Sequence, residues 1–159
     1  MQEDFISGAL GSKEAQAIVP VVIEKIAAFD GDVVYTRDTH TANYLETAEG
    51  KKLPVLHSVK DTPGWQIHPD LHRAGEGKTA AVIDKPTFGS AELGRLAVAG
   101  NYDAIELVGL CTVYLCHFQC SLPEGTSVGD NDCCLERLLR RCNTGASCKC
   151  TAGNDHVSD

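Results

Sequence analysis

The sequence predicts an α/β fold, a doubly wound parallel sheet with flanking helices. Short β-branched runs typical of buried strands occur at 32–37, 79–84 and 104–109. A stretch with helical apolar spacing separates the second run from the third. This strand–helix–strand alternation implies parallel strands joined by right-handed crossovers. A chain of 159 residues has the length of one domain with a substantial core.

The first expected helix follows Ser12 and Glu14. Its apolar side chains recur at helical spacing and include Val19, Val22, Ile23 and Ile26. Pro20 is expected in the first turn of this helix, where its missing N–H costs nothing. Asp30-Gly31 is expected to end the helix before the strand at 32–37.

The next segment, 38–71, is irregular, polar and rich in Gly and Pro. Excursions of this length in compact domains usually carry function. After the second strand, Ser90 is expected to cap a helix that Gly100-Asn101 ends. The strand at 104–109 follows directly.

The strand ends predict where a ligand would bind. In open α/β sheets the ligand crevice lies beyond the carboxyl ends of the strands. Three such ends can be named: 37–40, 84–86 and 109–112. They bring a carboxylate, an imidazole, an ammonium group and thiols to one crevice.

Composition excludes several function classes. The chain is 43% hydrophobic and 23% charged, with a net charge of -8, which argues against nucleic acid or an anionic membrane as partner. It lacks an apolar run of about 18 residues, and its first residues do not have the pattern of a secretory signal, so we expect a cytoplasmic protein. All 8 cysteines lie at or after Cys111, which is not the distribution of a disulfide-built domain. A homo-oligomer is compatible with the sequence.

The Asp38-x-His40 pair is the first candidate site. Residues two apart in extended backbone point the same way, and His57 offers a third ligand. Two imidazoles and a carboxylate suit a divalent transition metal, zinc or iron(II). His68 and His72 are competing ligands of lower rank. The competing interpretation, that Asp38 caps a turn and the histidines are ordinary surface residues, is the commoner one for an isolated D-x-H pair.

Lys85 and the thiols are the second set of candidates. A lysine at the end of a buried strand can hold a substrate or keep a thiol ionised, but it can also be a snorkelling side chain at the sheet rim. Cys116 follows the third strand, where a helix N-terminus would give it thiolate character. Cys111 has the context of a buried structural cysteine.

Six motifs carry a family resemblance. In order they are DFISGAL (4–10), TRDTHTANY (36–44), LPVLH (53–57), TPGWQIHP (62–69), DKPTFGS (84–90) and ELVGLCT (106–112). Together they resemble the isochorismatase-like cysteine hydrolases, and within them the nicotinamidase branch. The resemblance covers nearly everything from residue 1 to residue 112.

The resemblance implies roles for particular residues. Lys85 matches the lysine of the family's Asp–Lys–Cys triad, and Asp38, His40 and His57 match its metal ligands, with zinc the preferred divalent metal. Phe5 matches an aromatic that lines the substrate pocket. The small-molecule substrate would be an amide such as nicotinamide. A cysteine thiolate would attack its carbonyl, ammonia would leave, and hydrolysis of the thioester would release nicotinate.

Two departures lead us to expect an inactive or nearly inactive chain. The family's catalytic aspartate aligns just ahead of Met1, and Asp4 matches a later, structural aspartate of the motif. The nucleophile matches Cys116 only with a shift of one position. We therefore expect a partial hydrolase domain at 1–112 and a Cys-rich tail at 113–159, poorly ordered and out of frame after a one-nucleotide shift near codon 113.

Three other functions stay open from the sequence. The chain is also consistent with a catalytically dead family member that still binds ligand or metal, or with another isochorismatase-like hydrolase. The tail cysteines, which include Cys133, Cys134, Cys142, Cys148 and Cys150, are a weaker candidate for a zinc or disulfide module, because they do not form paired C-x₂-C motifs.

Overall fold

The computed structural model describes residues 1–87, 89–102, 104–110 and 148–151. The chain divides into two compact units, Met1–Phe88 and Gly89–Asp159, which we describe separately. Parallel strands and flanking helices confirm the predicted α/β class. None of the helices among the described residues has the length and apolar character needed to cross a bilayer.

The sheet of the first unit consists of two parallel strands. Strand β1 spans Val33–Asp38 and β2 spans Thr79–Lys85, close to the predicted ranges. Their register places Asp38 opposite Lys85 at the carboxyl ends. Two side chains that the sequence separates by 47 positions are therefore cross-strand neighbours.

Two helices precede the sheet: α1 at Glu3–Ile6 and α2 at Lys13–Ala28. Ser12 caps α2 by accepting a hydrogen bond from the Ala15 N–H, so the helix begins earlier than we predicted. Pro20 consequently lies inside the helix, and its expected place in the first turn is wrong. Its side chain is exposed, so the carbonyl left without an N–H partner can be hydrated.

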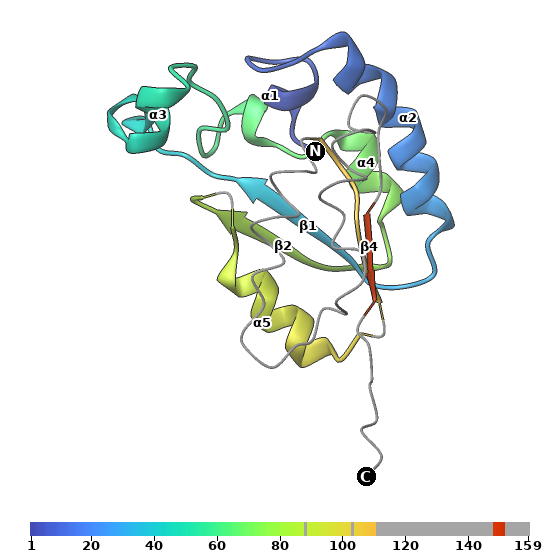
Figure 1. The fold of residues 1–159 in the computed structure, drawn as a ribbon. Helices are drawn as coiled ribbons and strands as arrows, with labels where there is room; N and C mark the ends of the chain where they lie inside the picture. The colour runs from blue at the N-terminus through green and yellow to red at the C-terminus, as the bar shows by residue number, and fades with distance from the viewer. Residues whose placement is uncertain (88, 103, 111–147, 152–159) are drawn as a thin grey trace. The chain divides into compact units, whose positions relative to one another are not determined.

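The long segment between the strands folds into four short helices. They are η1 (Tyr44–Glu46), α3 (Ala48–Lys52), η2 (Pro63–Trp65) and α4 (Pro69–Ala74). Figure 1 shows α2 and α4 side by side along the β1–β2 pair, with α3 beyond the end of β1. The Tyr35 hydroxyl donates to the Leu71 carbonyl at 2.6 Å, which ties β1 to α4.

The core of this unit lies where α2, α4 and one face of the strands meet. Its apolar members include Ala15, Val19, Val22, Ile26, Tyr35, Leu71 and Ile83. The buried residues of α2 recur every three or four positions, as the apolar stripe of the sequence predicted.

The second unit contains α5 (Ala91–Gly100), β3 (Ala104–Leu107) and β4 (Cys148–Thr151). Ser90 caps α5 and Asn101 ends it in the left-handed conformation, both as predicted. β3 pairs antiparallel with β4, which we did not predict, whereas we expected β3 as a third parallel strand. Apart from β4, the predicted tail at 113–159 lies outside the described residues.

Candidate functional site

An ion pair lies at the carboxyl ends of β1 and β2. The Lys85 ammonium donates to Oδ1 of Asp38, and the Lys85 side chain is only 3% exposed. Burial lowers the pKa of Lys85 from 10.5 to about 8, so the group is still mostly an ammonium at neutral pH. The snorkelling alternative for Lys85 is wrong, because the side chain is buried and paired.

The main chain of Asp38 is held by the side-chain amide of Gln2. The Gln2 Oε1 accepts from the Asp38 N–H at 2.8 Å, and its Nε2 donates to the Asp38 carbonyl at 2.8 Å and to the Trp65 carbonyl at 2.9 Å. Gln2 is 3% exposed. This buried amide therefore acts on β1 as a neighbouring strand would, and it fixes the backbone from which the Asp38 carboxylate projects.

A second cluster contains His40, Glu49 and His57. One possible ligand atom from each lies within 4.8 Å of the other two. The two imidazole rings make an edge contact, with centroids 4.9 Å apart. Thr39, between Asp38 and His40, donates its N–H to the Lys85 carbonyl at 2.9 Å, so the cluster adjoins the ion pair.

Both imidazoles have a nitrogen available for a metal. Nδ1 of His57 lies 2.7 Å from the Val55 carbonyl, which assigns the proton to Nδ1 and leaves the lone pair on Nε2. Nε2 of His40 is buried and has no hydrogen-bond partner among the described residues. Burial, and then repulsion from His57, lowers the pKa of His40, which favours the neutral form that binds metals.

Aromatic rings enclose the histidines. Tyr44 is 1% exposed, and its ring centroid lies 4.5 Å from that of His40 and 4.9 Å from that of His57. Burial, and then the Glu49 charge, raises the pKa of the Tyr44 hydroxyl. Phe5 makes an edge contact with His57 at 5.5 Å between centroids. The residue predicted to line a substrate pocket therefore lies against a predicted metal ligand.

Asp4 holds the loop that carries His57. Its Oδ2 accepts from the Ser58 N–H at 2.7 Å, and the Ser58 carbonyl in turn accepts from the His40 N–H at 2.9 Å. A Cβ at position 64 would lie 2.1 Å from Oδ1 of Asp4, so this approach requires Gly64. This is the structural role that the resemblance implied for Asp4.

Glu49 is the member of the cluster that we did not predict. It lies in the first turn of α3, which Thr47 caps by accepting from the Gly50 N–H at 3.0 Å. A Cβ at Gly50 would lie 2.1 Å from the Tyr44 carbonyl oxygen, so α3 approaches η1 closely only because residue 50 is glycine. The available signal was a carboxylate on a capped turn between His40 and His57, followed by glycine.

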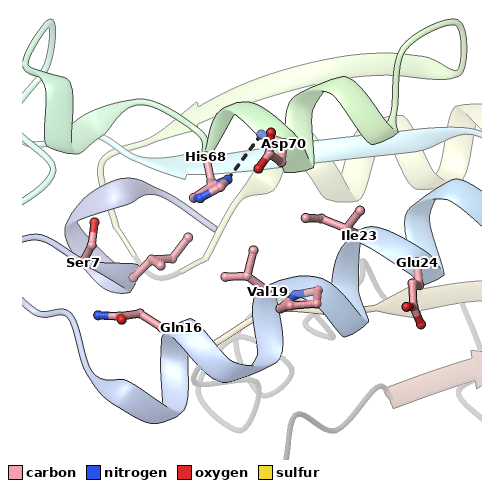
Figure 2. Close-up of a pocket in the computed structure, with 9 residues that line it drawn as sticks. Ser7, Gln16, Val19, Ile23, Glu24, His68 and Asp70 are labelled. Carbon is pink, nitrogen blue, oxygen red and sulfur yellow. Dashed lines mark hydrogen bonds between the residues drawn. The ribbon is translucent and has the colours of Figure 1, made fainter.

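The other predicted ligands lie elsewhere. His68 caps α4, its Nδ1 accepting from the Asp70 N–H at 3.3 Å, and the His72 ring stacks on Tyr35 with centroids 6.0 Å apart. Figure 2 shows His68 facing Val19 across an open groove of about 530 Å³. None of the clustered residues lines this groove.

Five of the six predicted site residues therefore meet within the first unit: Phe5, Asp38, His40, His57 and Lys85. Cys116 and Cys111 lie outside the described residues. The role of Asp38 as a metal ligand stays a prediction, since the geometric cluster contains Glu49 and the Asp38 carboxylate contacts Lys85.

The donor set fits a metal ion. Two imidazole nitrogens and a carboxylate are the ligands that divalent transition metals prefer, and the buried Nε2 of His40 is a ligand atom that no protein group in the described residues uses. The ring Nδ1 of His57 is held by a carbonyl, as is usual for metal-bound histidines. The cluster can therefore hold a metal ion.

Comparison with known proteins agrees with this site. The family model described as the isochorismatase domain matches residues 1–118. The search of curated proteins gives no match. The match covers most of the chain and includes the ion pair, the histidine cluster and the position of Cys116. The chain belongs to the isochorismatase-like hydrolase family.

Proposed function

We propose that the site is that of a nicotinamidase-type amidase, which takes a small aromatic carboxamide beside a divalent metal. The observation that carries the proposal is the cluster of His40, Glu49 and His57 next to buried Lys85. A hydrolase that lacked a metal would not need buried neutral imidazoles with an unused nitrogen. Zinc is the metal we favour, because two imidazoles and one carboxylate with an open position match catalytic zinc sites.

The residues of the chain then have distinct tasks. Half-buried Phe5 packs an aromatic ring of the substrate next to His57. Lys85, kept charged beside Asp38, stabilises negative charge that develops on the carbonyl oxygen or on a nearby thiolate. A bound metal would supply Lewis acidity and an open position for a heteroatom of the substrate. The nucleophile would be Cys116, which lies outside the described residues.

We also propose that this chain turns over nicotinamide slowly or not at all. Cys116 matches the family nucleophile only with a shift of one position, and the carboxylate that contacts Lys85 is Asp38. Loss of one member of a catalytic set costs about 10⁴ to 10⁶ in kcat. The second candidate function, a member that binds ligand and metal without turnover, has the same supporting observations.

Calorimetry and an ammonia assay on the full chain test both statements. We expect nicotinamide to bind the zinc-loaded chain, and ammonia release to stay near the background rate. Phe5→Ala should weaken nicotinamide binding, whereas Phe29→Ala, at an exposed ring after α2, should not. Failure of the folded chain to bind nicotinamide would contradict the proposed substrate, and rapid ammonia release would contradict the loss of turnover.

We further propose that the hydrolase sequence ends at residue 112 and that 113–159 is read out of frame. The support is the loss of helix and strand patterns after Thr112 in favour of a Cys-rich composition. Sequencing the gene across codons 110–120, together with the intact mass of the product, tests this. A product with the printed mass from an unambiguous gene would end the idea. The cytoplasmic location and a homo-oligomer stay predictions.

A further inference from the structure

Asp38 faces two cationic claims in this site. The resemblance assigns its carboxylate to the metal, whereas the structure directs that carboxylate to Lys85. The two claims differ in their consequences, because the first requires four ligand residues around the ion and the second requires three.

The backbone limits how far Asp38 can move. Its N–H and carbonyl are both bonded to the buried amide of Gln2, at 2.8 Å each, on one edge of β1. On the other edge, β1 pairs with β2, and the register sets Asp38 opposite Lys85. The Asp38 main chain is therefore held from both sides, and the carboxylate can change partners only by turning about its side-chain bonds.

Charge balance disfavours such a turn. Lys85 is 3% exposed, and among the described residues Asp38 is the carboxylate in ion-pair contact with it. If Asp38 left to bind a dication, a buried ammonium would remain unpaired beside that dication. An uncompensated buried charge is strongly destabilising, and here repulsion between the two cations would add to it.

The histidine cluster does not need Asp38. His40, Glu49 and His57 already offer two nitrogens and one carboxylate within 4.8 Å of one another. Three protein ligands with an open fourth position are the usual composition of a catalytic zinc site. Glu49 lies on α3, which the cap by Thr47 and the close approach at Gly50 hold against η1.

We infer that the metal centre is formed by His40, Glu49 and His57 alone, and that Asp38 is the fixed counter-ion of Lys85 instead of a fourth ligand. The inference rests on the proposed metal centre. It makes Asp38 a positioning residue that keeps the ammonium charged and in place between the metal and β2. Glu49 becomes the carboxylate on which metal affinity depends.

Zinc affinity of the full chain, measured by competition with a chromophoric chelator, tests the inference. Glu49→Gln removes a ligand, and its dissociation constant should rise at least tenfold, since even outer-shell changes cost ten- to hundredfold. The double variant Asp38→Asn/Lys85→Met removes one charge of each sign and leaves no buried ammonium unpaired. Its dissociation constant should stay within about threefold of wild type.

Asp38→Asn alone should lose more stability than the double variant, because it leaves Lys85 unpaired. If that single variant does not fold, the double variant still decides the ligand set. A double variant that loses zinc as strongly as Glu49→Gln would overturn the inference and leave the metal centre standing. Unchanged affinity in Glu49→Gln would also overturn it. Lack of zinc binding by the wild type would overturn the metal centre itself.

Discussion

Two pairs of histidines in the first unit behave differently although the sequence presents them alike. His40 and His57 are buried, contact each other and belong to a possible metal cluster. His68 caps a helix and His72 stacks on a tyrosine. The difference comes from what surrounds each ring. The first pair lies beyond the ends of β1 and β2, where backbone bonds to Asp4 and Ser58 hold both loops together.

Removing one histidine from each pair gives the largest expected contrast. His57→Ala deletes a ligand whose tautomer is set by the Val55 carbonyl, so zinc should bind about a hundredfold or more weakly. His72→Ala removes an imidazole of the same chain from a stacking position and should leave zinc affinity unchanged. Titration with a competing chelator measures both. Equal losses in the two variants would show that the pairs do not differ.

Gly50→Ala should disturb the first pair through α3. The added Cβ would lie 2.1 Å from the Tyr44 carbonyl oxygen, a backbone atom that cannot move aside freely. We expect a loss of about 1–3 kcal/mol in the free energy of unfolding, together with weaker zinc binding as Glu49 shifts. Urea denaturation and zinc titration of the same samples measure the two effects.

Gly94→Ala is the control for this change. It adds a methyl group in the interior of α5, where nothing lies within 4 Å. This variant should be stabilised by up to about 1 kcal/mol through helix propensity, with zinc binding unchanged. The same destabilisation in both variants would mean that the close contact at Gly50 has no effect of its own.

The pH dependence of stability should also distinguish the pairs. Burial, and then His57, lowers the pKa of His40 below the 6.5 of an exposed histidine, so the unfolded chain binds the proton more readily than the folded chain. The contribution of His40 to the free energy of unfolding is therefore complete above pH 6.5 and declines as the pH falls through 6.5 toward the folded pKa. His40→Gln should flatten this decline in urea melts without metal. The matched loss of a histidine at position 68, His68→Gln, should keep it.

Much of the site could be predicted because it follows from strands. The β-branched runs at 33–38 and 79–85 predict two parallel strands, and the rule for their carboxyl ends then brings Asp38 and Lys85 together. Glu49 and Gln2 could not be found this way, because their roles depend on tertiary contacts. Glu49 depends on the approach of α3 at Gly50, and Gln2 acts on a strand 36 positions away. Pro20 was misplaced because the cap at Ser12 outweighs the preference of proline for a first turn.

The smallest expected effect concerns the local role of His68. Its Nδ1 accepts from the Asp70 N–H at 3.3 Å, a long bond at the start of α4, so His68→Ala should cost about 0.5–1 kcal/mol of unfolding free energy. Asp is a good cap residue, and His68→Asp should restore this loss while removing the imidazole entirely. Denaturant melts of the three proteins give the comparison. If His68→Asp were as unstable as His68→Ala, the imidazole would act through the groove that it lines and not through the cap. Recovery by aspartate would show that the second pair of histidines is retained for helix termini and packing, whereas the first pair cannot be replaced by any residue that merely satisfies the backbone.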